Sequence, residues 1–337
     1  MAAGVLVTLG LPWLAMNLWN RLEEARFCNL ADRQMVAIEA NLDTAFDSVL
    51  LLAGHFATTP PTATDRASFR RIVGPVLAAH PFIQAFSWDP RIGRDERQAS
   101  EILASAEGPA AFAIFERNEG GAQQRAGDRA EFIPVLYIEP MAANATAISF
   151  DLASNPVRRQ TLAQARDSGQ PKATARIVLV QEAGHQFGVL VLAPVFGAGP
   201  DEDVAARRRA LKGYISGVFR IGDLVEETRK RLHRDHAATA ASLIDNHLFD
   251  VSDPAASQQV FPDGFEISVQ RPLAGLHAQS RISFAGRTWL LVATRRGNWP
   301  RISASRPMPS CATSFCPASG NALPRWNGVP RMASGTR

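Results

Sequence analysis

The sequence contains few groups of side chains that could carry out a reaction. Residues 233–236 read His-Arg-Asp-His, and a His-Arg-Asp triplet occurs in the catalytic loop of phosphoryl-transfer enzymes. This triplet follows the charged run ETRKRL in a segment that predicts a helix, and no glycine-rich phosphate loop precedes it. We therefore interpret the triplet as a chance match on a solvated helix.

Three carboxylates on neighbouring strand-like runs, Glu131, Glu139 and Asp151, are the other candidates for catalysis. Two of them could act as general acid and base if the fold brought them together. Carboxylates at strand ends are more often solvated or hydrogen-bonded, and the sequence has no G-x-S-x-G nucleophile motif. Its seven histidines and three cysteines lack the spacing of metal ligands. We therefore predict no enzyme, no metal site and no cofactor.

The net charge of +4 hides an uneven distribution of charged residues. Ten of the 36 basic residues follow Glu266, where no acidic residue occurs, so residues 1–266 carry a net charge of −6. A mildly acidic folded part does not favour nucleic-acid binding, because nucleic-acid-binding domains gather basic side chains on one face. The 337-residue length and 46% apolar content indicate a globular chain with room for two domains.

Residues 1–20 contain no charged side chain and are about long enough to cross the hydrocarbon core of a bilayer. A cleaved signal peptide is the rival interpretation, but it would need a basic start and a small-x-small cleavage site, and neither is present. Thr8, Pro12 and Asn17 weaken the span, so a buried helix is a second alternative. We interpret residues 1–20 as a transmembrane anchor. The balanced charges of residues 21–26 do not indicate its orientation.

A long apolar seam follows the anchor. Small or apolar residues recur at alternating spacings of three and four, at Cys28, Ala31, Met35, Ile38, Leu42, Ala45, Val49, Leu52 and Phe56. This pattern predicts one long helix, which Pro60 and Pro61 must end. Two interpretations of the seam remain open. It packs on the helix's own domain, or it joins two copies of the chain beside the membrane, and on the second we expect a homodimer.

Beyond these prolines the pattern changes to short apolar runs with few helices between them. Asp65 suits a helix N-cap, while Asn155 or Ser154 with Pro156 and Gly169 marks the start and end of another helix. A further helix is predicted over 222–238. The strand-like runs are 81–88, 111–117, 131–139, 146–152, 173–181, 186–196, 211–220, 267–270, 281–285 and 287–294. This order predicts an α+β fold with antiparallel sheets and allows two similar sheet modules in tandem.

Six motifs in a consistent order carry a resemblance to a known family. They read FSWDPRIGRDER (86–97), FAIFER (112–117), EFIPVLYIEP (131–140), SFDLASNPVRR (149–159), ARDSGQPKAT (165–174) and GVLVLAPVF (188–196). Together they resemble the CHASE domain, an extracytoplasmic sensor of bacterial histidine kinases and diguanylate cyclases and of plant cytokinin receptors. The similarity extends over roughly residues 65–295.

The resemblance implies an architecture that agrees with the pattern of elements. A long N-terminal stalk helix is followed by two tandem PAS-like antiparallel-sheet modules, with the ligand in the membrane-distal one. We therefore expect an anchor at 1–20, a stalk helix and hinge at 21–64, and a sensor domain at 65–295. Within the sensor, the distal module covers about 81–196 and the proximal module about 197–295. Residues 296–337 have no acidic group and no periodicity, and we expect a disordered or frameshifted tail there.

The resemblance also suggests ligand-binding positions, which differ here from those of cytokinin-binding members. Arg158 stands where those members place an Asp that pairs with the adenine-type ring, and Leu192 stands in place of a Thr. Thr174 and Val180 match positions that contribute a hydroxyl and a backbone group. We expect the pocket to be lined by Trp88, Tyr137, Leu152, Arg158, Thr174, Val180 and Leu192. An Arg in place of an Asp favours a carboxylate or phosphate over a neutral purine. The alternative for Arg158 is a solvated position on the helix surface.

These features predict a membrane-tethered sensor of a bacterial signal-transduction receptor, in the inner membrane with its sensor in the periplasm. The tail suggests that a histidine kinase or diguanylate cyclase output domain has been lost. The alternative is a periplasmic small-molecule binding protein without signalling output, and an uncharacterised hydrolase is a third, weaker hypothesis. The expected partners are an anionic small molecule, the membrane and a second copy of the chain, without nucleic acid.

Overall fold

A computed structural model describes most of the chain up to Arg296. The described residues are 2–59, 65–107, 112–179, 187–197, 203–235, 244–262 and 276–296. The side chains of residues 2–10, 107 and 233–235 lie outside this description. The predictions for Val180, for a strand at 267–270, for the His-Arg-Asp-His side chains and for the tail at 296–337 therefore fall outside it, apart from Arg296 itself.

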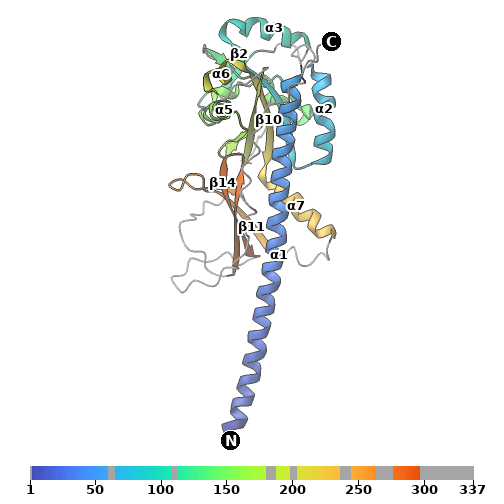
Figure 1. The fold of residues 1–337 in the computed structure, drawn as a ribbon, viewed down its shortest axis with the longest axis vertical. Helices are drawn as coiled ribbons and strands as arrows, with labels where there is room; N and C mark the ends of the chain where they lie inside the picture. The colour runs from blue at the N-terminus through green and yellow to red at the C-terminus, as the bar shows by residue number, and fades with distance from the viewer. Residues whose placement is uncertain are drawn as a thin grey trace, which may run out of the picture.

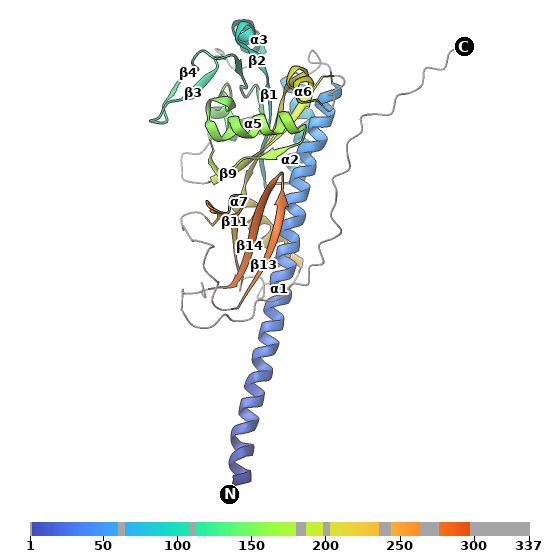
Figure 2. The same ribbon diagram turned by 60° about the vertical axis from the view of Figure 1, so that its left-hand side comes forward.

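A single helix, α1 (Ala2–Thr58), runs the length of the molecule. Its C-terminal half lies against two sheets, while its N-terminal part projects beyond them (Figures 1 and 2). The predicted seam is buried from Ala31 to Phe56, and Ile38 and Leu42 are each 1% exposed. Val49 of α1 packs directly over Gly217 in the first sheet, where an added Cβ would lie 2.6 Å from the Cγ2 atom of Val49.

This packing decides between the two interpretations of the seam. Its residues share one hydrophobic core with strands from both sheets, so the helix packs on its own domain. The alternative, a seam between two copies, is wrong for this arrangement because the same side chains are already covered. Two polar contacts hold the register of the helix. Asn41 Nδ2 donates to Thr228 Oγ1 at 2.6 Å, and Asn246 Nδ2 donates to Gln34 Oε1 at 2.6 Å.

The predicted anchor at 1–20 forms the free end of α1. Within the part of the chain that the structure describes, no helix combines the length and apolar content needed to cross a membrane.

The first sheet forms the upper part of the body in Figure 1 and is antiparallel throughout. Its order is β6 (Tyr137–Glu139), β1 (Ile83–Pro90), β10 (Leu211–Arg220), β9 (Phe187–Phe196) and β7 (Lys172–Ala173), with β8 (Ile177–Val178) also paired to β9. Because β10 pairs with both β1 and β9, this sheet extends to Arg220 and crosses the module boundary expected at 197.

The second sheet lies below the first along α1 (Figure 2). Its order is β12 (Gln258–Phe261), β11 (Ile244–Asp250), β14 (Arg287–Arg295) and β13 (His277–Phe284). Helix α7 (Ile221–Asp235) follows β10 directly and connects the two sheets in sequence. Two antiparallel sheets in tandem beside a long helix confirm the predicted α+β fold.

Helix α2 (Arg66–Ala79) begins at the predicted cap, where Asp65 Oδ1 accepts a hydrogen bond from the Ser68 amide at 2.7 Å. Short elements cover the face of the first sheet that points away from α1. They are β2 (Ile92–Gly93), η2 (Arg94–Glu96), α3 (Arg97–Glu107), β3 (Phe115–Arg117), β4 (Gln123–Arg125), β5 (Glu131–Phe132), α4 (Met141–Asn144), η3 (Ala145–Ala147), η4 (Leu152–Ser154), α5 (Pro156–Ser168) and α6 (Val204–Ala210).

One predicted strand is absent from this covering layer. Residues 146–152 form the end of η3, two isolated bridges and the start of η4 instead of a strand. Ser149 there has a positive φ of 68°, which is incompatible with an extended run. The alternating apolar residues are nevertheless buried, because Phe150 and Leu152 point into the layer beneath.

The first sheet therefore separates two cores. The helix-side core joins the α1 seam to Phe69, Phe86, Tyr137, Val191, Ile215 and Phe219, and to residues of the second sheet such as Leu248, Ile282, Trp289 and Leu291. The outer core lies on the opposite face. It contains Ala85, Ile92, Phe112, Ile114, Phe115, Ala126, Phe132, Ile133, Val135, Ile138, Ala147, Ile148, Phe150, Leu152, Ala153, Leu162, Ala165, Ile177, Leu179, Leu190, Leu192, Phe196, Leu211, Tyr214 and Val218.

A pair of substitutions on α1 tests this packing. Ile38→Asp places a charge in the helix-side core and should lower the thermal midpoint of the intact chain by roughly 10 °C or more. Leu51→Asp on the same helix, where the side chain is 75% exposed, should change it by no more than about 2 °C. Differential scanning calorimetry in detergent gives both values, and equal shifts would contradict burial of the seam.

The same packing bears on whether the sensor domain expected at residues 65–295 can fold without α1. Without α1, the helix-side core loses its whole seam and both sheets expose apolar faces. We expect a fragment of residues 65–295 to lack a cooperative unfolding transition, whereas residues 21–295 should retain one. Near-ultraviolet circular dichroism during heating distinguishes the two fragments, and a sharp transition in the shorter one would show that α1 is dispensable.

Candidate functional site

The outer face of the first sheet carries an unusual row of polar side chains. Ser87 lies directly opposite Ser216 on the neighbouring strand, and Asp89 lies opposite Tyr214. Residues opposite each other in an antiparallel pair share a face, and Tyr214 belongs to the outer core. The four side chains therefore point away from α1 and into the layer beneath α5.

Helix α5 covers this layer, and its ends are set by the residues expected from the sequence. Asn155 Oδ1 accepts from the Arg158 amide at 3.2 Å, Pro156 occupies the first turn, and Gly169 ends the helix with a left-handed φ of 70°. The buried face of the helix presents Arg158, Thr161, Leu162 and Ala165. Arg158 and Leu162 lie one turn apart on that face.

Tyr214 ties α5 to the sheet. Its hydroxyl donates a hydrogen bond of 2.9 Å to the main-chain oxygen of Leu162. Burial raises the pKa of Tyr214 well above its ordinary value, so the hydroxyl keeps its proton and remains a donor. This bond places Asp89, the neighbour of Tyr214 across the strands, under the same helix that carries Arg158.

Arg158 is the buried cation of this layer, with only 4% of its surface exposed. Its Nη2 atom donates to the Val178 main-chain oxygen at 3.2 Å, and its guanidinium carbon lies 5.1 Å from the ring centre of Phe150. Its Nε atom has no hydrogen-bond partner, and no described carboxylate forms an ion pair with it. The alternative of a solvated Arg158 is therefore wrong.

Burial lowers the pKa of Arg158 to about 10, and the charge of Arg117 contributes to the same shift. The side chain remains a cation at neutral pH despite this cost. A buried guanidinium that meets only a carbonyl and an aromatic ring can bind a carboxylate or phosphate through its unused donors.

Asp89 is the buried acid of the layer and is fully enclosed. Its Oδ2 atom accepts a hydrogen bond from the hydroxyl of Ser216, whereas its Oδ1 atom has no partner. Burial raises the pKa of Asp89 to about 7, and hydrogen bonds from Ser216 and Ser87 offset part of that effect. The carboxyl can therefore exist in either protonation state near neutral pH.

Four of the seven residues predicted for the pocket lie on this side of the sheet. Leu152 and Leu192 belong to the outer core, and Arg158 lies on the buried face of α5, which covers that core. Thr174 is buried at the sheet edge, where its Oγ1 atom accepts from the Leu190 amide at 3.1 Å and its own amide donates to the Leu190 oxygen at 2.8 Å. Val180 lies outside the described residues.

Trp88 and Tyr137 lie on the other face of the sheet. They are opposite each other in the pairing of β1 with β6, and both pack into the helix-side core. Phe56 of α1 stacks on Trp88 with ring centres 5.8 Å apart, and Phe69 of α2 lies 6.0 Å from Tyr137. The structure therefore does not bring these two aromatic residues into the layer that holds Arg158.

Sequence reasoning missed Asp89, Ser216 and Tyr214. A usable signal was present in β1, where Ser87 and Asp89 stand at alternate positions between apolar neighbours. Such alternation assigns two polar side chains to one face of a strand. Their burial depended on α5 covering that face, which the local pattern does not reveal.

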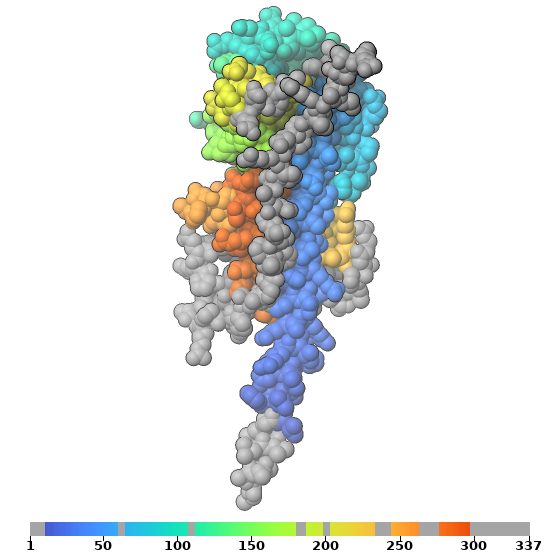
Figure 3. All heavy atoms as spheres, in the orientation of Figure 1, coloured from blue at the N-terminus to red at the C-terminus, as the bar shows by residue number. Residues whose placement is uncertain are grey.

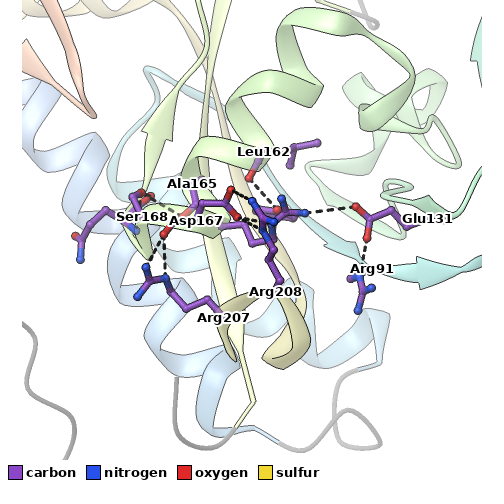
Figure 4. Close-up of polar contacts among 11 residues, drawn as sticks. Arg91, Glu131, Leu162, Ala165, Asp167, Ser168, Arg207 and Arg208 are labelled. Atoms are coloured by element: carbon purple, nitrogen blue, oxygen red, sulfur yellow. Dashed lines mark hydrogen bonds and ion pairs between the residues drawn. The ribbon is translucent and has the colours of Figure 1, made fainter. Parts of the chain in front are cut away.

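The C-terminal end of α5 is held by an ion-pair network (Figure 4). Asp167 binds Arg208 at 2.6 Å and Arg166 at 2.8 Å, and its main-chain oxygen accepts from Arg207. Hydrogen bonds from Arg208 and Arg166 hold the pKa of Asp167 well below its ordinary range. Glu131 continues the network to Arg91 at 2.8 Å, so this carboxylate fixes the layer instead of pairing with another acid.

The other acid–base candidates are also engaged separately. Asp151 accepts from the amides of Ile133 and Ala153 at 2.9 and 3.0 Å and from Arg129 at 2.8 Å. Glu139 accepts from the Met141 amide at 3.3 Å. No two of the three candidate carboxylates form a pair in the described part of the chain, and no group of His, Cys, Asp and Glu there could hold a metal ion.

Residues 62–261 match the family model of the CHASE domain, which is more than half of the chain. The chain belongs to the CHASE family. Two curated relatives are "Probable histidine kinase 3" and "Probable histidine kinase 6" of Oryza sativa subsp. japonica, 26% identical over 200 residues and 23% identical over 192 residues. Each alignment covers 55% of this chain but only 19% and 18% of the relative. The chain thus spans about a fifth of the length of these relatives.

The fold is also that of solved sensor domains. The periplasmic sensory domain of the Campylobacter jejuni chemoreceptor Tlp1 aligns with a TM-score of 0.50 at 12% identity, covering 86% of this chain and 99% of that domain. At this identity the likeness concerns the fold alone, and it agrees with the predicted α+β architecture. The CHASE family is a sensor family, and any kinase activity of the curated relatives lies outside the shared segment.

The pH dependence of stability tests the burial of Asp89. The pKa of this carboxyl is raised in the folded chain, so folding binds a proton between the unfolded pKa of about 4 and the folded pKa of about 7. The contribution of Asp89 to stability should therefore be largest at low pH and fall as the pH rises through this window, by on the order of 4 kcal/mol. Asp89→Asn should remove that fall, as measured by urea unfolding from pH 4 to pH 8.

The titration of His247 changes the stability in the opposite direction, and it does so equally in the wild type and in Asp89→Asn. Burial lowers its pKa to about 4, so it favours unfolding as the pH drops below about 6.5. The difference between the wild type and Asp89→Asn isolates the carboxyl. A difference that stays constant between pH 4 and pH 8 would mean that Asp89 is not buried as described.

Proposed function

We propose that this CHASE domain is the ligand-sensing input of a bacterial signal-transduction receptor, exposed to the periplasm. Its ligand binds in the outer layer of the first sheet, beneath α5. The observation that carries this proposal is Arg158, a buried cation whose Nε donor is unused and whose visible partners are a carbonyl and a ring. A fold gains nothing from a buried, unpaired charge, whereas a binding site can use one.

The chemistry of the layer indicates the class of ligand. Phe150 packs against Arg158, and Leu152 and Leu192 of the same outer core add apolar surface, as in most small-molecule sites, while Thr174 provides a hydroxyl. A guanidinium presents its donors as a planar fork that suits a carboxylate or phosphate. The proposed ligand therefore has an apolar body and an anionic group.

Helix α1 is the proposed route for the signal. It packs against both sheets, and its Val49 side chain lies over Gly217 on β10, one residue after Ser216 of the layer beneath α5. We propose that ligand binding in the distal module shifts β10 against Val49 and so alters how α1 sits on the proximal module. The ligand can shift this equilibrium only by its difference in affinity for the two arrangements.

The free end of α1 supports a tether to the membrane. Large apolar side chains are exposed between residues 11 and 22, and their spacing distributes them round the helix. In this stretch the helix stands clear of the sheets (Figure 3). They are Leu11, Trp13, Leu14, Met16, Leu18, Trp19 and Leu22. Such a surface is unfavourable in water and suits the apolar part of a bilayer. We propose that this segment holds the sensor at the inner membrane.

Cell fractionation tests the tether. The full chain should sediment with membranes and resist extraction by carbonate, whereas a chain that starts at residue 21 and carries a cleavable export signal should appear in the soluble periplasmic fraction. Release of the full chain into the soluble fraction would favour the alternative, a periplasmic binding protein without signalling output.

Ligand chemistry is tested on the intact chain in detergent. We expect 3-phenylpropanoate, pentanoate or inorganic phosphate to raise the thermal midpoint, while adenine and trans-zeatin leave it unchanged. Arg158→Ala should abolish the effect of the anions, and Arg158→Lys should weaken it because the bidentate fork is lost. Arg159→Ala removes an exposed arginine next along the helix and should keep the wild-type response.

The controls separate loss of binding from loss of folding. The midpoint of each variant without ligand is measured first, and only variants with a cooperative transition are compared. Stabilisation by the neutral purines that survives Arg158→Ala would overturn the proposed anion contact.

A further inference from the structure

Asp89 stands out among the buried acids of the described residues. Its Oδ1 atom is the only carboxylate oxygen among the buried polar atoms there that lacks a hydrogen-bond partner. The side chain is fully buried at the end of β1, on the face that points toward α5. A carboxyl oxygen in that position loses its hydrogen bonds to water and gains no hydrogen bond from the protein.

Other buried aspartates of the described residues have more hydrogen-bond and ion-pair partners than Asp89. Asp151 is equally enclosed, yet two main-chain amides and Arg129 satisfy it. Asp250 is 4% exposed and binds Arg287 as well as Ser252. Asp89 meets only the hydroxyls of Ser216 and Ser87, and no described cation pairs with it. Its environment is thus incomplete where those of Asp151 and Asp250 are complete.

The partner of Asp89 must come from the layer that it faces. That layer also holds Arg158, whose Nε atom is likewise buried and unused. Tyr214 relates the two residues, because it lies opposite Asp89 in the sheet and donates to Leu162, one helical turn after Arg158. Asp89 therefore enters this layer from the sheet and Arg158 enters it from α5, and the two side chains form no ion pair with each other.

We propose that Asp89 is a second ligand contact, which accepts a hydrogen bond from an amino group, so that the ligand is a small amphoteric molecule with an anionic group for Arg158. This inference rests on the proposed function and extends it. The apolar body of the ligand lies against Leu152 and Leu192, between the two charged contacts. Ser87 and Ser216 orient the Asp89 carboxylate, and the ligand's ammonium supplies the missing charge.

A ligand with both an anionic group and an amino group would account for both Arg158 and Asp89. An anionic ligand alone would satisfy Arg158 and leave the Asp89 oxygen without a partner. An amine alone would satisfy Asp89 and leave the guanidinium unpaired. A molecule that carries both groups removes both penalties, so its affinity should exceed that of either single-charge analogue.

Two matched sets of compounds test the inference by isothermal titration calorimetry on the intact chain in detergent. The first set is L-phenylalanine, 3-phenylpropanoate and 2-phenylethylamine, which keeps the two groups close together. The second is 5-aminopentanoate, pentanoate and pentylamine, which separates them by four methylenes. At least one amphoteric compound should bind about tenfold or more tighter than its own anion and its own amine.

Substitutions assign the two contacts. Asp89→Asn keeps the shape of the side chain and should reduce the amphoteric compound to the affinity of its anion, while the affinity of the anion stays unchanged. Arg158→Ala should remove binding of both. Asp128→Asn changes an exposed aspartate outside the layer and should have no effect on any of the six affinities.

The outcomes separate this inference from the function on which it rests. If the anions bind through Arg158 and an added amine gives no gain, or if Asp89→Asn leaves the gain intact, the role of Asp89 is overturned and the proposed function stands. If an amine binds through Asp89 and Arg158→Ala has no effect, the anion contact fails instead. If none of the six compounds binds, the proposed function itself is overturned.

Discussion

The burial of one face of α1 is the constraint on which the rest of the structure depends. A single run of side chains from Phe27 to Phe56 completes the core of two separate sheets. Neither sheet has another element that could cover its inner face over this length, among the described residues. The two sheets are therefore fixed relative to each other through the helix. A displacement of one sheet must shift the α1 side chains that also pack against the other sheet. This coupling suits the proposed function, in which a change in the first sheet passes along α1 to the second.

Local signals in the sequence placed the ends of α2 and α5 well, but they missed α3 and α6 and described the strands less well. Asp65, Asn155, Pro156 and Gly169 act through hydrogen bonds and dihedral preferences within one turn, so their effect is visible without the rest of the fold. Residues 146–152 show the limit. Alternating burial arises there from turns and bridges, which the alternation of apolar residues does not distinguish from a strand. The α1 seam likewise predicted an apolar stripe, while the partner that covers it followed from tertiary packing.

The sequence predicted one part of the candidate site, Arg158, but not the side chains that the strands contribute to it. Similarity to a family identified Arg158, but the faces of the strands depend on parity and register. Trp88 and Asp89 are neighbours in sequence and lie on opposite faces of β1, so an error of one residue moves a side chain from one core to the other. Trp88 packs into the helix-side core, whereas Asp89 faces the layer of Tyr214 in the outer core. The pairing of β1 with β10 and β6 had to be known before either residue could be assigned.

Two buried ionisable groups without a full set of partners in one layer are costly for a fold of marginal stability. Asp151 and Arg129 show that the same layer can bury an acid beside a base and satisfy both through a direct contact. Arg158 and Asp89 avoid such a contact, although each retains an unused buried atom. Packing alone does not require either charge, because apolar residues of similar size would fill the same space at lower cost. A ligand that supplies both missing partners would relieve these two penalties on binding, and the relief would add to its affinity.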